Sequence, residues 1–260
     1  SCFDFKGKLL WEFRADRGKV SPISVGDVDG DGLPEIIYGS DGGRVYCISN
    51  DGKWRWEMDP DEDSPFGRSA PVVVDINADG KMEVLIAKSN YSPKQRLYAL
   101  DARTGEVLWD FETKLHVYAC LASGDINLDG RPEIVCGDKA NVVYCLDGSG
   151  AELWRTPLDG RGFFFGPLLA DINGDRLSEV IVGLRRDGGT KPSLYVLSSE
   201  GALLESYPVT GRGVIGPPAV FDIDGDGRSE ILFVATNPAK LVCLETAGTS
   251  EGIWPCYRRC

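Results

Sequence analysis

The strongest constraint on the fold of this 260-residue chain is a nine-residue acidic motif that occurs five times. Each copy reads D-x-[DN]-x-D-x-x-x-E, and successive copies begin 48, 50, 46 and 51 residues apart. Self-similarity at this spacing is typical of β-propellers, whose blades recur every ~40–50 residues. The five copies span residues 27–35, 75–83, 125–133, 171–179 and 222–230.

Short apolar segments surround every motif in the pattern of a four-stranded antiparallel unit. One segment precedes the motif and another follows it directly, which predicts a hairpin with the motif at its tip. A third segment, such as 97–101, follows in all five units. A fourth follows in four units and ends in Trp56, Trp109, Trp154 or Tyr207. Four antiparallel strands per repeat are typical of a propeller blade, and we expect the tryptophans to pack between blades.

The sequence therefore predicts an all-β, five-bladed β-propeller in a single domain over residues 1–260. The fifth unit has no fourth segment, whereas residues 6–13 resemble one. We expect this N-terminal strand to complete the last blade and close the ring, which removes two exposed sheet edges. A fragment of a longer solenoid or of a larger propeller is the alternative. The predicted blades are 20–59, 68–113, 117–158, 164–209 and 215–247 plus 6–14.

The motif offers oxygen ligands at its first, third, fifth and ninth positions, and such ligands suit calcium. Cysteine and histidine are absent from the motifs, which argues against thiophilic metals. The motifs hold 17 of the 40 carboxylates, and five calcium ions would change the net charge from −12 to −2. Plain turn formation by Asp, Asn and Gly is the alternative. The expected ligands of up to five calcium ions are Asp27, Asp29, Asp31, Glu35, Asp75, Asn77, Asp79, Glu83, Asp125, Asn127, Asp129, Glu133, Asp171, Asn173, Asp175, Glu179, Asp222, Asp224, Asp226 and Glu230.

With these loops the chain resembles the FG-GAP repeats of integrin α chains, whose blades bind calcium at a D-x-D-x-D-G loop between their first two strands. The steps Phe66-Gly67 and Phe165-Gly166-Pro167 fit the same family. The third and fourth segments, as in 97–109, also resemble blades of pyrroloquinoline-quinone-type propellers. The resemblance implies a calcium-stabilised, lectin-like or adhesion scaffold that is secreted or at the cell surface, extracellular or periplasmic.

Catalysis is not expected from the residue inventory. The chain has one histidine, His116, so no Ser–His or Cys–His arrangement recurs. We therefore expect a non-catalytic module that binds a glycan or a protein. A polysaccharide-active or quinone-dependent enzyme and a purely structural assembly subunit are the alternatives.

Charge and hydropathy exclude two kinds of partner. The net charge of −12 argues against nucleic acid, whose binding depends on clustered Lys and Arg. The longest apolar stretch, residues 163–170, is too short to span a membrane, which takes ~20 residues.

We expect the ligand on the face opposite the metal loops, where cations recur before the first strands and between the second and third. Arg44 and Arg96 belong to the latter group. Ordinary solvated loop charge is the alternative. The cations before the first strands are Arg17, Arg68, His116, Arg161 and Arg212.

The eight cysteines divide into two groups. Cys47, Cys145 and Cys243 occupy one equivalent strand position and are expected to be small buried hydrophobes. Cys120 and Cys136 are candidates for one disulfide, and Cys2 for another with either Cys256 or Cys260. A terminal cysteine left over is available to link two chains into an oligomer. Such bonds imply an oxidising compartment.

Overall fold

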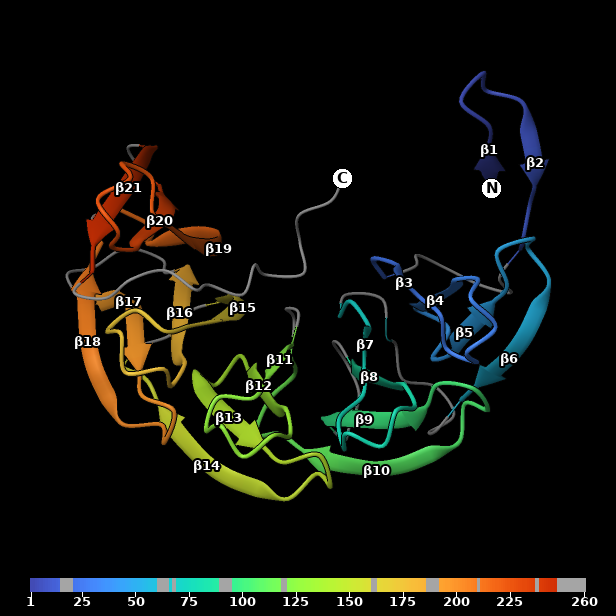
Figure 1. Cartoon of the computed structure of the whole chain (residues 1–260), viewed down its shortest axis with the longest axis horizontal. Helices are drawn as coiled ribbons and strands as arrows, with labels where there is room; N and C mark the ends of the chain where they lie inside the picture. The colour runs from blue at the N-terminus through green and yellow to red at the C-terminus, as the bar shows by residue number, and fades with distance from the viewer. Residues whose placement is uncertain are drawn as a thin grey trace. The chain divides into compact units, whose positions relative to one another are not determined.

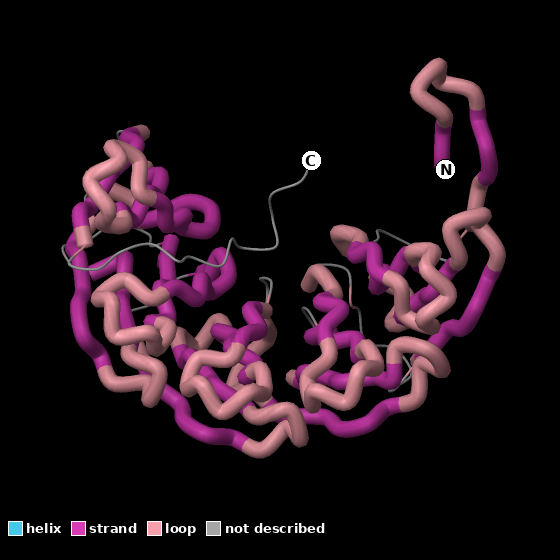
Figure 2. Tube along the Cα trace, in the orientation of Figure 1, coloured by secondary structure: helices cyan, strands magenta, loops and turns pink. Residues whose placement is uncertain are grey.

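The computed structural model describes residues 1–14, 21–59, 66, 69–88, 95–117, 121–159, 163–185, 192–209, 211–236 and 239–246. All its regular elements in these ranges are strands, which confirms the all-β class (Figures 1 and 2). The chain forms two compact units, Ser1–Asp75 with Asp79–Val117 and Ile76–Ala78 with Tyr118–Cys260.

The first unit contains a small sheet and two four-stranded antiparallel sheets. Its small sheet pairs β1 (Cys2–Phe3) with β2 (Leu9–Trp11). The first large sheet has the order β3 (Ser24–Gly26), β4 (Glu35–Gly39), β5 (Val45–Ile48), β6 (Trp54–Met58). The second has the order β7 (Val72–Val74), β8 (Glu83–Ala87), β9 (Arg96–Asp101), β10 (Val107–Glu112).

The second unit contains two four-stranded sheets and a three-stranded sheet, all antiparallel and in chain order. The first consists of β11 (Ala122–Gly124), β12 (Glu133–Gly137), β13 (Val142–Leu146) and β14 (Glu152–Pro157). The second consists of β15 (Phe163–Ala170), β16 (Glu179–Arg185), β17 (Pro192–Leu197) and β18 (Leu203–Pro208). The third consists of β19 (Val214–Phe221), β20 (Glu230–Ala235) and β21 (Lys240–Glu245).

The core is built mainly on the second and third strands of the four-stranded sheets. These strands are largely buried, as in β8 and β13, where every residue is buried, whereas β21 of the three-stranded sheet is largely exposed. This explains why they are continuous apolar runs, since both of their faces pack against neighbouring layers. The outer strand β14 instead alternates between partly buried and exposed residues.

The cysteine prediction for the third strands is correct twice and wrong once. Cys47 and Cys145 are buried, whereas Cys243 is exposed. Cys243 lies on β21, which is the last strand of a three-stranded sheet in the described part of the chain, so no fourth strand covers it. Burial raises the pKa of the Cys47 thiol to about 12, which keeps it protonated and unreactive.

The repeated tryptophans join successive sheets, as predicted. The indole N–H of Trp56 on β6 donates to the carbonyl of Ala102 in the next sheet, 2.9 Å away. A Cβ added at Gly105 in the same turn would lie 2.6 Å from the Trp56 ring, so only glycine fits there. The same arrangement joins Trp154 to Ser199 and Gly201, and Trp11 to Asn50 and Gly52.

Strand β2 therefore contacts the β3–β6 sheet as the outer strand of a preceding blade would. Its recorded strand partner is β1, and the sheet of β19, β20 and β21 has three described strands. Five blades and ring closure by the N-terminal strand accordingly stay predictions.

Candidate metal-binding loops

Each acidic motif connects the first and second strands of its sheet, as predicted. The first Asp directly follows the first strand, and the final Glu is the first residue of the second strand. These strand ends pair, for example Gly26 with Glu35 and Phe221 with Glu230. The pairing brings the two ends of the motif together, so its intervening acids project from one tight turn.

The first Asp of the motif holds the turn through backbone N–H groups. In the first loop, the Asp27 carboxylate accepts hydrogen bonds from the N–H of Gly30 at 2.8 Å and of Gly32 at 2.9 Å. Gly32 has φ +85°, a conformation that glycine adopts without steric cost. Arg176 occupies this sixth position in the fourth loop at φ 76°, which is strained for a residue with a Cβ.

The final Glu of the motif is buried and uses one oxygen in the same way in four loops. In the fifth loop, Oε2 of Glu230 accepts the N–H of Ile223 at 2.8 Å. This bond fixes the carboxylate and directs its other oxygen, Oε1, toward the loop. The equivalent bonds run from Val28 to Glu35, from Ile126 to Glu133 and from Ile172 to Glu179.

The loops differ in the hydrogen-bond partner of Oε1 of the final Glu. In the third and fourth loops the side-chain amide at position three donates to it, from Asn127 to Glu133 at 3.0 Å and from Asn173 to Glu179 at 2.9 Å. In the first and fifth loops position three is an aspartate, which has no proton to donate at neutral pH.

In the first loop a guanidinium contacts Oε1 instead. Arg55 on β6 donates from Nη2 to Oε1 of Glu35 at 3.2 Å. In the fifth loop Oε1 of Glu230 has no hydrogen-bond partner, although the side chain is only 4% exposed. The arginine within that loop, Arg228, pairs with Glu245 at 2.6 Å.

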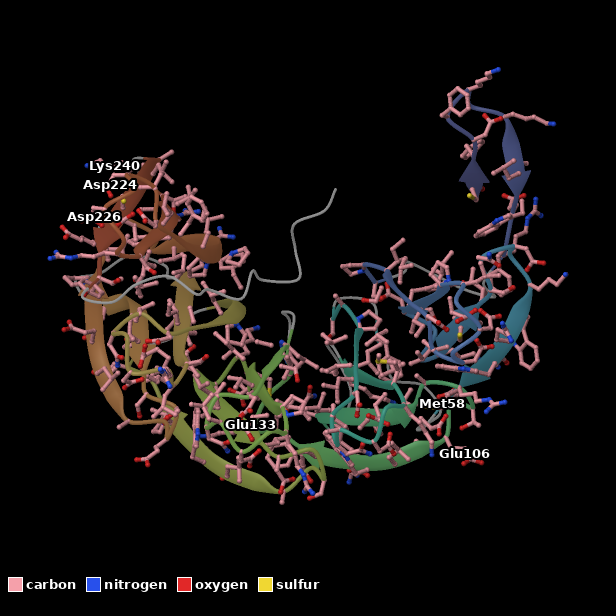
Figure 3. All side chains as sticks on the ribbon, viewed as in Figure 1. Met58, Glu106, Glu133, Asp224, Asp226 and Lys240 are labelled. Atoms are coloured by element: carbon pink, nitrogen blue, oxygen red, sulfur yellow. The ribbon has the colours of Figure 1, made fainter. Side chains whose placement is uncertain are left out.

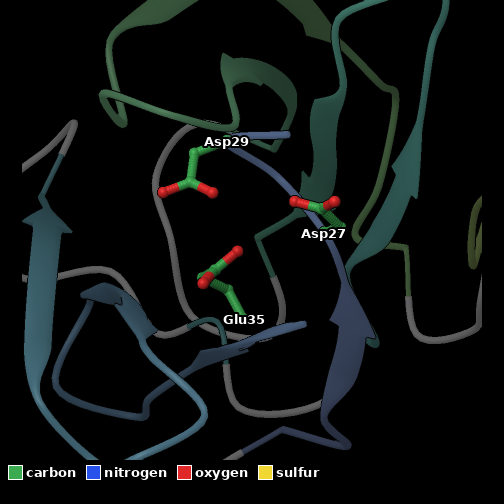
Figure 4. Close-up of side chains that lie close together, drawn as sticks. All are labelled: Asp27, Asp29 and Glu35. Atoms are coloured by element: carbon green, nitrogen blue, oxygen red, sulfur yellow. The ribbon is translucent and has the colours of Figure 1, made fainter. Parts of the chain in front are cut away.

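Two loops bring three carboxylates together. One oxygen each from Asp27, Asp29 and Glu35 lie within 4.8 Å of one another. Figure 4 shows these three side chains pointing toward a common centre. Asp222, Asp224 and Glu230 form the equivalent group in the fifth loop, where Figure 3 labels Asp224.

Crowding of carboxylates also affects the loops that contain asparagine. Burial, together with the charges of Asp175 and Asp171, raises the pKa of Glu179 to about 7. Burial and the neighbouring aspartates likewise raise the pKa of Glu133. A buried carboxylate beside other acids gains free energy by binding a proton or a cation.

The donor set fits calcium. Each loop supplies hard carboxylate or amide oxygens, and the buried Oε1 of Glu230 lacks the partner that a cation would provide. A buried carboxylate oxygen without a partner bears an uncompensated desolvation cost of at least about 1–3 kcal/mol. Calcium, with its six to eight oxygen ligands and flexible geometry, is the cation these donors suit best.

The predicted ring of cations for a ligand is only partly described. Arg17, Arg68 and Arg161 lie outside the described residues. His116 and Arg212 are described but belong to different compact units, so the ring stays a prediction.

The arginines between the second and third strands are partly neutralised within their own sheets. Arg44 pairs with Glu57 at 2.6 Å, and Arg96 pairs with Asp110. Both acids lie on the outer strand of the same sheet. These two arginines are therefore less available to an anionic ligand than sequence reasoning assumed.

The two predicted disulfides also stay predictions. Cys2 and Cys136 are free thiols in the structure. Their expected partners, Cys120, Cys256 and Cys260, lie outside the described residues.

Comparisons with known proteins support the repeat assignment. A family model described as FG-GAP-like repeat matches residues 27–86 and 125–182, so the chain contains FG-GAP-like repeats. A lambda-carrageenase of Pseudoalteromonas sp is 37% identical over 116 residues, which cover 45% of this chain and 11% of that protein. Integrin alpha pat-2 of Caenorhabditis elegans is 22% identical over 228 residues, covering 66% of this chain and 19% of that protein.

Among solved structures, rhamnogalacturonan lyase YesW superposes with a TM-score of 0.64 at 20% identity, covering 91% of this chain and 51% of that one. At this identity the similarity shows the fold alone.

The chain spans no more than about a fifth of the length of the lambda-carrageenase and of integrin alpha pat-2.

Proposed function

We propose that these FG-GAP-like repeats form a calcium-binding, non-catalytic module that binds a polysaccharide outside the cell. The observation that carries the calcium part is the unpartnered Oε1 of Glu230 beside Asp222 and Asp224. The backbone bond to the final Glu recurs in the third and fourth loops, and the second loop has the same motif, so the proposal extends to these three loops. The residues that would hold the ions are those of these motifs and of the fifth, whereas the first loop also contacts Arg55.

The proposed binding role is supported by the relatives and by the hydrogen bonds of the motif glutamates. Integrin alpha pat-2 and the lambda-carrageenase both match this chain, and the second is named for a polysaccharide. The motif glutamates that hold the turns are committed to backbone N–H groups, as Glu133 is to Ile126. These bonds give the glutamates a structural task in the turns, which favours a binding module over a polysaccharide-cleaving enzyme.

An extracellular location fits the same chemistry. Calcium sites of extracellular modules have dissociation constants of about 10⁻⁴–10⁻³ M, and exposed loops that combine carboxylates with backbone oxygens suit that range. In the described part of the chain no helix is long and apolar enough to cross a membrane. We propose a secreted or cell-surface protein.

The test is a binding screen of the whole chain against carrageenans, pectic polysaccharides and neutral glucans, in calcium buffer and in chelator. We expect calcium-dependent binding to at least one polysaccharide, which the mass spectrum of the recovered sugar shows to be intact. Cleaved sugar would replace this proposal with the enzyme alternative. Binding to a protein partner alone, with none to any polysaccharide, would contradict the ligand class.

A further inference from the structure

One arginine sets the first acidic loop apart from the others. Four outer-strand positions are equivalent in the sheet register, where Trp56 pairs with Cys47, Trp109 with Ala99, Trp154 with Cys145 and Glu205 with Val196. The residue before each is Arg55 in the first blade and a leucine in the others. The leucines Leu108, Leu153 and Leu204 are 50%, 49% and 49% exposed.

Arg55 does not extend into solvent as these leucines do, but reaches the acidic loop of its own sheet. Its Nη1 lies 2.9 Å from Oδ2 of Asp29, and its Nη2 lies 3.2 Å from Oε1 of Glu35. A longer contact of 3.6 Å joins Nη2 to Asp31. One guanidinium thus contacts three of the four carboxylates of this motif.

The partners of Arg55 are buried enough for these contacts to matter. The side chain of Glu35 is 1% exposed and that of Asp29 is 15% exposed, whereas that of Arg55 is 39% exposed. Water therefore screens the negative charges of Glu35 and Asp29 less than it screens the positive charge of Arg55. A buried carboxylate without a positive partner is costly, so the contact stabilises the two acids more than it stabilises Arg55.

The first motif differs from the other four in containing no cation of its own. Residues 27–35 carry four carboxylates and no Lys or Arg, whereas the other motifs contain Lys81, Arg131, Arg176 and Arg228. Arg55 supplies a positive charge to the first loop from the outer strand of the same sheet.

We propose that the Arg55 guanidinium is a built-in cation that takes the place of calcium in the first loop, so that this loop is folded without metal. It rests on the proposed calcium function of the other loops. A calcium ion entering the first loop would have to displace a charged hydrogen bond to Glu35 and an ion pair to Asp29, and then lie beside a positive charge. The first loop therefore binds calcium more weakly than its four carboxylates alone would.

The test measures calcium binding by equilibrium dialysis of the whole chain, with two opposite substitutions and a control. Arg55→Leu gives the first loop the residue that other blades have. Leu153→Arg places an arginine at the equivalent position beside the third loop. Arg155→Leu is the control, because Arg155 contacts Glu152 and the ring of Tyr144 instead of an acidic loop.

We expect Arg55→Leu to bind one more calcium ion, or to bind its weakest ion at least about tenfold more tightly, because displacing a charged hydrogen bond costs on that order. We expect Leu153→Arg to lose about tenfold affinity at one site. Arg155→Leu should match the unmodified chain. In chelator, Arg55→Leu should melt below Arg155→Leu, and added calcium should reverse that difference.

Equal ion number and affinity in the unmodified chain and in Arg55→Leu would overturn the inference while the calcium function stands. Absence of calcium binding in every variant would instead overturn the proposed function, and the inference with it. If Arg55→Leu does not fold, Arg55→Gln removes the charge while keeping a polar side chain, and the same comparison decides.

Discussion

At the scale of single residues, the final Glu of each motif has two tasks that its two oxygens divide. Oε2 accepts a backbone N–H and closes the turn, as Glu230 does with Ile223. Oε1 faces the other acids and needs a positive or hydrogen-bonding partner. The loops of Glu35, Glu133, Glu179 and Glu230 share the first task and differ in the second. We therefore expect the partner of Oε1 to decide how strongly each loop binds a cation.

The fifth loop allows this division to be tested with Glu230→Gln. We expect the variant to lose one bound calcium ion, because a neutral amide is a weaker ligand than a carboxylate. In chelator it should be as stable as the unmodified chain or more stable by about 1 kcal/mol, since its orphaned charge is gone. Calcium titration and chemical unfolding with and without chelator measure both effects.

Glu200→Gln is the matched control for this substitution. Glu200 is exposed in the turn between β17 and β18, outside the acidic motifs. It should keep the calcium count. Loss of calcium in both variants, or in neither, would be inconsistent with a site built on Glu230.

At the scale of elements, a tryptophan on the outer strand of one sheet is fixed against a glycine turn of the next. Trp56 donates to Ala102 and covers Gly105, which has φ +77°. Glycine is needed here for two reasons, the left-handed backbone and the close approach of the ring. The contact therefore joins the β3–β6 sheet to the β7–β10 sheet.

Replacing Gly105 by alanine should separate these two reasons when it is compared with Gly7→Ala. Gly7 has φ +80°, but an added Cβ there meets nothing within 4 Å. We expect Gly7→Ala to cost about 1–2 kcal/mol of unfolding free energy from backbone strain alone. Gly105→Ala should cost about 1–3 kcal/mol more, because the Trp56 ring has to move. Equal costs in urea unfolding would show that the ring contact contributes nothing.

At the scale of the whole chain, carboxylates outnumber cations and concentrate at the strand connections. The net charge is −12, and 17 of the 40 carboxylates lie in the five motifs. Repulsion among such acids opposes folding unless cations bind the folded state. We therefore expect the stability of the chain to depend on bound calcium.

Removing calcium should lower the melting temperature of the unmodified chain. At a free concentration 100 times its dissociation constant, one site contributes about 2.7 kcal/mol, and a chain of this size shifts by about 2–4 °C per kcal/mol. We expect a fall of at least about 5 °C in a calcium-selective chelator, with magnesium kept constant as the control. Scanning calorimetry measures it, and identical melts in both buffers would refute the linkage.

Periodic features of the sequence were enough to predict much of this structure. The five motifs, the strands on either side of them and the packing of tryptophans such as Trp56 are local or repeat at a fixed spacing, so each copy supports the assignment of the others. The burial of Cys47 and Cys145 followed from the same equivalence. These features depend on the residue at each position and on its immediate neighbours.

Other features depend on which strand lies beside which, and only the tertiary structure decided them. Cys243 occupies the same repeat position as Cys145 yet is exposed, because its strand has no described outer neighbour. Arg55 lies 20 residues from Glu35 in the chain, and no motif marks it as a partner of that loop. Sheet pairing places the outer strand β6 near the acidic loop of the same sheet. The residue at position 55 therefore changes the net charge around residues 27–35.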